Sequence, residues 1–284
     1  RAVEVCYKCA YTQFEGLPSC PLPSDWQRIV RQKDELVAQL RQGKYVDVAK
    51  LYPNITIIRG RAQLTGGRSV SVNGQSLTPG KIILATGAVP WAPPIPGLKE
   101  TGFLESTDAL SLQALPTSLL VIGGGAIGLE LGQLFARLGV TVTILEAAPH
   151  IAPAEEPEIS HALTEYLTDE GLQIHTGLRV TGVARASDGC CVHVERAGKS
   201  ETFEAEQLLV TAGRRPNTQN LGLEAAGVKV GPRGEIVVNE YLQTTNPDIY
   251  AAGDCIGEPM FVYVAAYAGG LAAENALTGP RRTY

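Results

Sequence analysis

A glycine-rich run after a short apolar stretch is the sequence's clearest sign of chemistry. Residues 123–128 read GGGAIG, which fits the pattern G-x-G-x-x-G. In this pattern Gly123 permits a tight turn, Gly125 leaves room for a pyrophosphate, and Gly128 lets a helix pack closely on a strand. The N-terminus of that helix offers free N–H groups and a partial positive charge to phosphates. The run therefore predicts a dinucleotide site.

An acidic residue at the end of the next apolar run indicates which nucleotide binds. Glu146 lies 18 residues after Gly128, close to the roughly 20 residues expected for the acid that binds an adenosine ribose. A carboxylate there accepts a hydrogen bond from a free 2′-OH and repels a 2′-phosphate. Residues 147–149 include no Arg or Lys, and His150 is the one candidate cation nearby in sequence. The sequence thus favours NADH over NADPH.

The elements that must position these residues alternate between strand and helix. Strands are expected at residues 55–58, 69–72, 81–85, 119–122, 140–145 and 249–252, and helices at 25–51, 127–138, 155–170 and 262–277. This alternation indicates an α/β protein with a parallel sheet. Four prolines within residues 88–96 predict an irregular crossover linker.

Composition excludes several classes of function. The 284 residues are enough for two domains, and a net charge of −5 without a basic run argues against nucleic acid as a partner. The longest apolar stretch is interrupted by Glu130 and by glycines, so no membrane span is expected. Six cysteines are too few for a disulfide scaffold in a chain of this length. We therefore expect a cytoplasmic protein.

Four blocks of sequence resemble the flavin-dependent pyridine nucleotide–disulfide oxidoreductases. They are ILATGA at 83–88, GGGAIGLE at 123–130, AGRRPN at 212–217 and NPDIYAAGD at 246–254, in the family's order. The resemblance implies two Rossmann-like domains of three-layer architecture, one binding FAD and the other NAD(P), with one inserted in the other.

The resemblance also implies domain boundaries. Residues 1–110 would be part of an FAD-binding domain, 111–240 an NAD(P)-binding domain, and 241–284 a return to the FAD-binding domain. The family's catalytic dithiol, its first glycine motif and its C-terminal dimerisation domain have no counterpart in the sequence. We therefore expect an internal piece of a longer, homodimeric parent protein.

Individual roles follow from the same resemblance. The residues that would contact FAD are Ala62, Thr86, Gly87, Asp254, Met260, Phe261, Val262 and Tyr263. The residues that would surround NADH or NADPH are Gly123, Gly125, Gly128, Glu146, Val180 and Gly213. Glu130 would be a catalytic residue near the nicotinamide.

Two further stretches resemble the mercuric reductase branch of the family. These are QKDELV at 32–37, continuing to KYV at 44–46, and FVYVAA at 261–266. They imply flavin-dependent reduction of Hg(II), delivered as a thiol complex, to Hg(0). Tyr45 would be a catalytic residue and a metal contact beside the flavin dithiol.

Other interpretations stay open at this point. Glu146 and Ala126 favour a dihydrolipoamide dehydrogenase-like enzyme that uses NADH, and a nucleotide-binding module without catalysis is a third possibility. Cys6 and Cys9 have the spacing of a redox or metal pair, but they have no second pair of ligands. Cys190 and Cys191 are interpreted as strand residues, and Cys255 as a small buried side chain.

Overall fold

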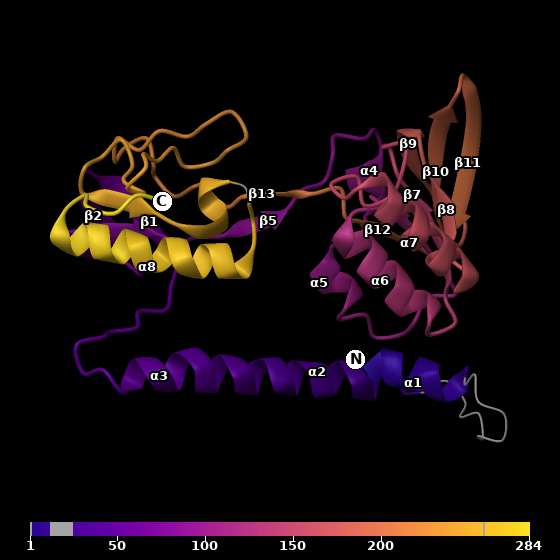
Figure 1. Ribbon diagram of the computed structural model, residues 1–284, viewed down its shortest axis with the longest axis horizontal. Helices are drawn as coiled ribbons and strands as arrows, with labels where there is room; N and C mark the ends of the chain where they lie inside the picture. The colour runs from indigo at the N-terminus through magenta and orange to yellow at the C-terminus, as the bar shows by residue number, and fades with distance from the viewer. Residues whose placement is uncertain (1, 12–24, 258) are drawn as a thin grey trace. The chain divides into compact units, whose positions relative to one another are not determined.

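The protein divides into two compact units (Figure 1). The computed structural model describes residues 2–11, 25–257 and 259–284. Parallel strands flanked by helices confirm the expected α/β class. No helix among these residues has both the length and the apolar character needed to cross a membrane.

Each unit is built from two segments, and the segments of the two units alternate along the chain. The first unit comprises Arg1–Val48 and Trp91–Gly213, and the second comprises Ala49–Pro90 and Arg214–Tyr284. These limits differ from the expected changes at 110/111 and 240/241, because residues 88–90 and 214–216 pair with each other inside the second unit. The units reflect packing and not bound cofactor, so the assignment of segments to cofactor domains stays a prediction.

A four-stranded parallel sheet forms the centre of the first unit. Its order is β12 (Gln207–Val210), β6 (Ser118–Ile122), β7 (Thr141–Leu145) and β8 (Gln173–His175). Leu119 and Leu120 of β6 point into two different core clusters and are 0% and 1% exposed. Both faces of the strand are therefore buried, as is typical of parallel sheets.

Helices cover one face of this sheet and a second sheet covers the other. The helices that contribute to the first core cluster are α5 (Ser106–Ala109), α6 (Ala126–Ala136) and α7 (Pro157–Asp169). The other face packs on α4 (Leu98–Thr101) and on the antiparallel strands β9 (Arg179–Ala186), β10 (Gly189–Arg196) and β11 (Lys199–Ala205). The first unit thus has three layers.

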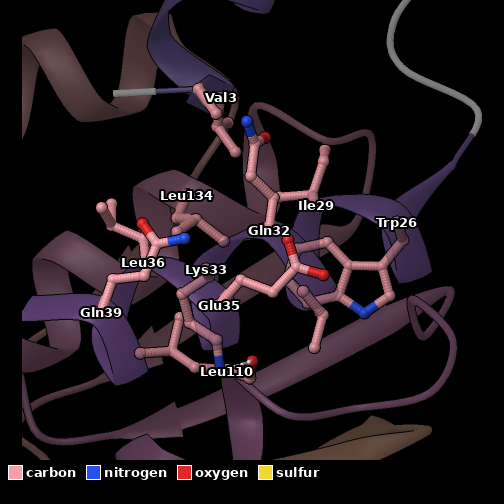
Figure 2. A pocket seen from close by; sticks show the side chains of 12 residues that line it. Val3, Trp26, Ile29, Gln32, Lys33, Glu35, Leu36, Gln39, Leu110 and Leu134 are labelled. Atoms are coloured by element: carbon pink, nitrogen blue, oxygen red, sulfur yellow. Dashed lines mark hydrogen bonds between the residues drawn. The ribbon is translucent and has the colours of Figure 1, made fainter. Parts of the chain in front are cut away.

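The helix α2 (Trp26–Arg41) docks on this unit, and α1 (Ala2–Ala10) belongs to the same unit. The indole N–H of Trp26 donates to the carbonyl of Leu112 at 2.7 Å, and the ammonium of Lys33 donates to that of Leu110 at 3.1 Å. Figure 2 shows these side chains around an apolar cavity of about 650 Å³. The chain continues through a π-helix η1 (Gln42–Val46) into α3 (Asp47–Lys50).

The second unit contains shorter strands. The strands β1 (Ala62–Gly66), β2 (Ser69–Val72) and β3 (Gln75–Leu77) form an antiparallel sheet, while β14 (Ile249–Ala251) pairs in parallel with β4 (Ile82–Leu84). A 3₁₀-helix η2 (Gly253–Ile256) follows β14, and α8 (Val262–Thr278) packs against Tyr250 and Ala252.

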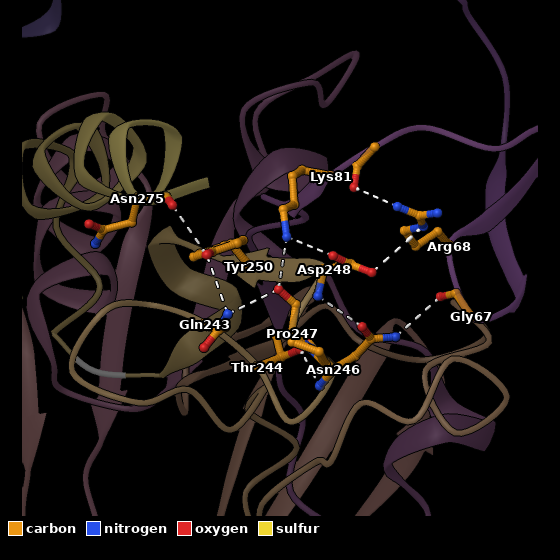
Figure 3. Close-up of polar contacts among 11 residues, drawn as sticks. Gly67, Arg68, Lys81, Gln243, Thr244, Asn246, Pro247, Asp248, Tyr250 and Asn275 are labelled. Carbon is orange, nitrogen blue, oxygen red and sulfur yellow. Dashed lines mark hydrogen bonds and ion pairs between the residues drawn. The ribbon is translucent and has the colours of Figure 1, made fainter. Parts of the chain in front are cut away.

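A polar corner fixes the approach to β14 (Figure 3). The carboxylate of Asp248 accepts from the ammonium of Lys81 at 2.6 Å and lies 3.6 Å from the guanidinium of Arg68. The side-chain amide of Asn246 donates to the carbonyls of Gly67 and Ala226. These contacts tie the segment before β14 to the hairpins that surround it.

One sequence-based prediction about strands was wrong, and one segment expected to be irregular begins with a short strand. Residues 55–58 form no strand, and Ile55 and Ile57 are about half exposed, because a strand needs a pairing partner as well as an apolar pattern. The expected crossover linker at residues 88–96 passes from the second unit to the first and is irregular over residues 91–95, but it begins with a strand, β5 (Ala88–Pro90), which pairs antiparallel with β13 (Arg214–Pro216). Pro90 is tolerated because this ladder has only two strands.

Candidate functional site

A cleft of about 820 Å³ lies at the carboxyl ends of β6 and β7 in the first unit. Its walls come from the glycine turn after β6, the end of β7, the start of β9 and the segment after β12. Crevices beyond the carboxyl ends of parallel strands are where ligands bind in open α/β sheets. This cleft is therefore the candidate site for the dinucleotide.

The glycine turn has the geometry that its sequence predicts. Gly123 has a φ of +109°, and a Cβ there would lie 2.7 Å from the carbonyl oxygen of Thr211. A Cβ on Gly128 would overlap the carbonyl oxygen of Gly123. A Cβ on Gly125, in contrast, would meet no atom within 4 Å. Two of these glycines are needed for packing, and the third leaves open space in the cleft.

Gly125 also caps α6 without a side chain. The first N–H groups of a helix need acceptors from outside the helix, and a phosphate can supply them. The open space at Gly125 and this helix end face the same cleft. The residues present therefore fit a pyrophosphate.

Glu146 stands at the end of β7 and is 9% exposed. Its carboxylate accepts from the backbone N–H of Gly124 at 2.5 Å and from that of Ala148 at 2.7 Å. The predicted ribose acid thus also holds the glycine turn in place. Each carboxylate oxygen keeps acceptor capacity for a further hydrogen bond, such as one from a ribose hydroxyl.

Sequence reasoning missed two residues of this cleft. Arg179 and Glu195 both line it, and their side chains form an ion pair at 2.5 Å. They come from neighbouring antiparallel strands, so the sequence alone gives no sign that they meet. The nearest signal was Val180, which was predicted for the site and lies in the same wall as Arg179.

The other predicted nucleotide residues divide into two groups. Val180 and Gly213 line the cleft. Glu130 is exposed on α6 and is not part of the cleft's lining in the described structure. Its predicted place near a nicotinamide stays a prediction.

In the second unit, the end of β4 and the start of η2 lie side by side. The backbone N–H of Ala252 donates to the carbonyl of Leu84 at 3.0 Å. Because β4 and β14 are parallel, Thr86 and Gly87 follow one strand at the same end at which Asp254 follows the other. Gly87 has a φ of +69°, and a Cβ there would meet no atom within 4 Å. These predicted flavin residues therefore share one edge of the β14–β4 pair.

Thr86 has a buried hydroxyl oxygen without a hydrogen-bond partner among the described residues. The nearby thiol of Cys255 donates instead to the carbonyls of Leu84 and Ala252, at 3.4 and 3.2 Å, and burial raises its pKa. A buried polar atom without a partner costs free energy, so its presence points to a ligand. The residues here fit a polar group of a cofactor.

The remaining predicted flavin contacts are more open. Ala62 is exposed at the start of β1, and Met260 is half-buried just before α8. Val262 is 83% exposed, and the rings of Phe261 and Tyr263 stack with their centroids 5.4 Å apart. Phe261, Val262 and Tyr263 are exposed and form an apolar surface at the start of α8.

Tyr45 lies on η1 and is 71% exposed. Its side chain does not line the cavity beside α2 or the cleft at the ends of β6 and β7. The structure thus leaves its predicted role in metal handling as a prediction.

The cysteines do not form a metal centre in the part of the chain that the structure describes, where no three His, Cys, Asp or Glu side chains gather around one point. Cys6 and Cys9 are free thiols on α1, and Cys20 lies outside the described residues. Burial raises the pKa of the Cys190 thiol, and Cys255 is fully buried, so both are structural side chains as expected.

Comparison with known proteins places these features in a family. The model of the pyridine nucleotide-disulphide oxidoreductases matches residues 15–269. The mercuric reductase of Staphylococcus aureus is 44% identical over 277 residues, which cover 98% of this chain and 50% of that protein. The mercuric reductase of Bacillus cereus is 45% identical over 279 residues, or 98% of this chain and 44% of that protein. The expected resemblance to mercuric reductases is confirmed.

A relative with a different name matches almost as widely. The dihydrolipoyl dehydrogenase of Thermus scotoductus is 40% identical over 258 residues, which cover 89% of this chain and 55% of that protein. The chain thus spans about half the length of the curated relatives it matches. Among solved structures, the HOCl-induced flavoprotein disulfide reductase RclA from Escherichia coli matches with a TM-score of 0.81 and 34% identity, covering 91% of this chain and 59% of that chain.

Proposed function

Because this chain belongs to the pyridine nucleotide-disulphide oxidoreductase family, we propose that it is part of a longer flavoprotein that reduces Hg(II) to Hg(0). The balanced reaction takes one hydride from NADH or NADPH, which supplies both electrons, and releases NAD(P)⁺ and a proton. The observation that carries this proposal is the match of mercuric reductases to 98% of the chain. Hg(II) as the substrate is inferred from the names of these relatives. The geometry of the cleft in the first unit supports NADH or NADPH as the hydride donor.

In this proposal the first unit binds the donor. The N–H groups at the start of α6 hold the pyrophosphate in the space beside Gly125. Glu146 accepts a hydrogen bond from the adenosine ribose, and Val180 and Gly213 form walls of the cleft. Glu130 then orients the nicotinamide end.

The second unit provides part of the flavin site. Thr86 offers its unpaired hydroxyl, Gly87 offers open backbone, and Asp254 offers a carboxylate for the ribityl chain. Ala62 would contact the adenine, and residues 260–263 would pass close to the ring system. FAD, when bound, supplies the two-electron acceptor between the nicotinamide and the metal region.

The metal itself is the substrate in this proposal. Soft thiolates are the ligands that a soft metal ion prefers, and we propose that Hg(II) arrives as a thiol complex. The exposed phenol of Tyr45 would contribute an oxygen contact. We also propose a cytoplasmic homodimer for the parent protein, and the free state of the described cysteines fits a reducing compartment.

A second candidate function has its own support. The dihydrolipoyl dehydrogenase relative is 40% identical, close to the mercuric reductases. Glu146 at the end of β7 also suits NADH. A dihydrolipoamide dehydrogenase-like activity is therefore the competing proposal.

One assay on the purified parent protein separates the two activities. We would follow NADH and NADPH oxidation with Hg(II) and excess thiol, and separately with lipoamide. Oxidation driven by Hg(II) and not by lipoamide supports the mercury proposal, and Tyr45→Phe should then lower the Hg(II) rate alone. Oxidation driven by lipoamide alone would contradict it. A bound flavin that neither nucleotide reduces would instead support nucleotide binding without catalysis.

A further inference from the structure

We propose that Arg179 determines nucleotide specificity and allows the cleft to accept NADPH as well as NADH. The inference rests on the proposed function only in requiring that the cleft binds a nicotinamide nucleotide. It concerns the adenosine end of the site, where the sequence showed the acidic Glu146, no nearby Arg or Lys, and His150 as the one candidate cation. The structure adds a cation there.

Backbone hydrogen bonds fix Arg179 beside the ribose acid. The N–H of Leu178 donates to the carbonyl of Glu146 at 3.3 Å, and the N–H of Gly177 donates to the carbonyl of Ala148 at 2.8 Å. Arg179 follows directly as the first residue of β9. The residues after the ribose acid are where a Rossmann fold accommodates a 2′-phosphate. Arg179 therefore reaches the same region from a different segment.

One ion pair orients the guanidinium of Arg179, and other N–H donors of the group remain available. Its Nη2 donates to Oε2 of Glu195 at 2.5 Å, across the β9–β10 ladder. A guanidinium has five N–H donors, so donors remain for a phosphate. The Arg179 side chain is 75% exposed, so an incoming phosphate can reach it without burying either charge. Arginine and phosphate form strong charge-assisted hydrogen bonds.

The repulsion between Glu146 and a 2′-phosphate is weaker than the sequence suggests. The Glu146 carboxylate already accepts two backbone N–H groups, from Gly124 and Ala148. These donors offset part of its negative charge, which lessens its repulsion of a 2′-phosphate. A cation at the rim can then decide whether the phosphate is accepted.

The test uses two ligands that differ only by the 2′-phosphate. We would measure binding of adenosine 2′,5′-bisphosphate and of 5′-AMP to the FAD-loaded, full-length parent protein by titration calorimetry. Arg179→Gln should weaken the bisphosphate about tenfold while 5′-AMP changes less than about twofold. Arg179→Lys should retain part of the difference, because it keeps the charge and loses the fork geometry.

Arg185→Gln is the matched control. It makes the same change on the same strand, at the far end of β9 and outside the lining of the cleft. It should leave both affinities unchanged. The effect of Arg179→Gln should also shrink as salt is raised, because the contact is exposed.

Two results would overturn the inference. One is an equal effect of Arg179→Gln on both ligands or no effect on either, and the other is a parent protein that binds neither ligand. The readout does not involve mercury. A protein that binds 5′-AMP and fails to reduce Hg(II) contradicts the proposed function alone, whereas an active mercury-reducing protein with unchanged Arg179→Gln affinities contradicts this inference alone.

Discussion

The turns that follow β6 and β14 have the same design and different surroundings. Each begins with a glycine at positive φ, +109° at Gly123 and +76° at Gly253. A Cβ on Gly123 would lie 2.7 Å from the carbonyl oxygen of Thr211, whereas one on Gly253 would come no closer than 3.3 Å to its nearest neighbour, the Cβ of Ala265. The backbone around Gly123 is therefore closely packed, whereas the backbone around Gly253 leaves more space for a side-chain atom.

The polar groups near the two turns differ in the same way. The Glu146 carboxylate has two backbone donors, whereas the Thr86 hydroxyl is buried without a partner among the described residues. A satisfied network is preorganised before any ligand arrives, and an unsatisfied one is completed by the ligand. The comparison supports the proposal that the nucleotide cleft is preformed by this chain, whereas the proposed flavin site around Thr86, Gly87 and Asp254 is completed by its cofactor.

The largest expected effect comes from the glycine turn of the first unit. Gly128→Ala places a Cβ against the carbonyl oxygen of Gly123, so the backbone must move. We expect the free energy of unfolding to fall by about 3 kcal/mol and NADH binding to be lost. Urea unfolding and fluorescence titration with NADH on the parent protein would measure both.

Gly125→Ala is the control for this experiment. A Cβ there meets no atom within 4 Å, so the free energy of unfolding should change by less than about 0.5 kcal/mol. NADH binding should still weaken, because the methyl group fills the space left for the pyrophosphate. Equal stability losses in the two variants would refute the division into packing glycines and a ligand glycine.

At the proposed flavin site, where Thr86 and Gly87 follow β4, a substitution should raise the free energy of unfolding instead of lowering it. Thr86→Val removes a buried hydroxyl that has no hydrogen-bond partner in the part of the chain that the structure describes, so the flavin-free protein should gain about 1 kcal/mol of unfolding free energy. Flavin retention should fall, because the cofactor loses a hydrogen-bond partner. Thermal unfolding of flavin-free protein and the ratio of flavin to protein absorbance would test this. Thr86→Ser, which keeps the hydroxyl, should retain flavin.

A smaller effect on the free energy of unfolding is expected from replacing glycines inside the helices α6 and α8. A Cβ on Gly269 of α8 would meet no atom within 4 Å, whereas one on Gly132 of α6 would lie 3.3 Å from Ile144. Gly269→Ala should therefore raise the free energy of unfolding by about 0.5 to 1 kcal/mol through helix propensity. Gly132→Ala should give less or reverse the sign, since α6 is packed more tightly. Paired urea titrations would show the difference.

Local patterns made much of the first unit predictable. The glycine run, the apolar strand before it and the acid after it are each encoded within a few residues, and the turn around Gly123 has the predicted geometry. Features that depend on distant pairing were not predictable. Arg179 meets Glu195 only because β9 and β10 pair, and residues 55–58 have a strand pattern but no partner strand.

The flavin edge shows a further limit of sequence reasoning. Motifs and family resemblance selected Thr86, Gly87 and Asp254, yet nothing in the sequence reveals that the Thr86 hydroxyl lacks a partner. That property depends on the packing of β4 against η2. A chain's own pattern therefore predicts a preorganised site more completely than a site that a cofactor completes.

The smallest effect concerns how the second unit responds to acid. The hydrogen bond from Lys81, together with the charge of Arg68, holds the pKa of Asp248 below its usual range, while slight desolvation opposes this. A lowered pKa in the folded state stabilises the protein above the unfolded pKa, and this stability is lost as the pH falls through the folded value.

The urea midpoint of the parent protein should therefore decline below about pH 4, and Asp248→Asn should flatten part of that decline. Because the side chains of these ion pairs are partly exposed, high salt should reduce the difference as well. Asp188→Asn, at an exposed turn between β9 and β10, should leave the pH dependence unchanged, and an identical flattening in that variant would show that net charge and not the corner around Asp248 is responsible.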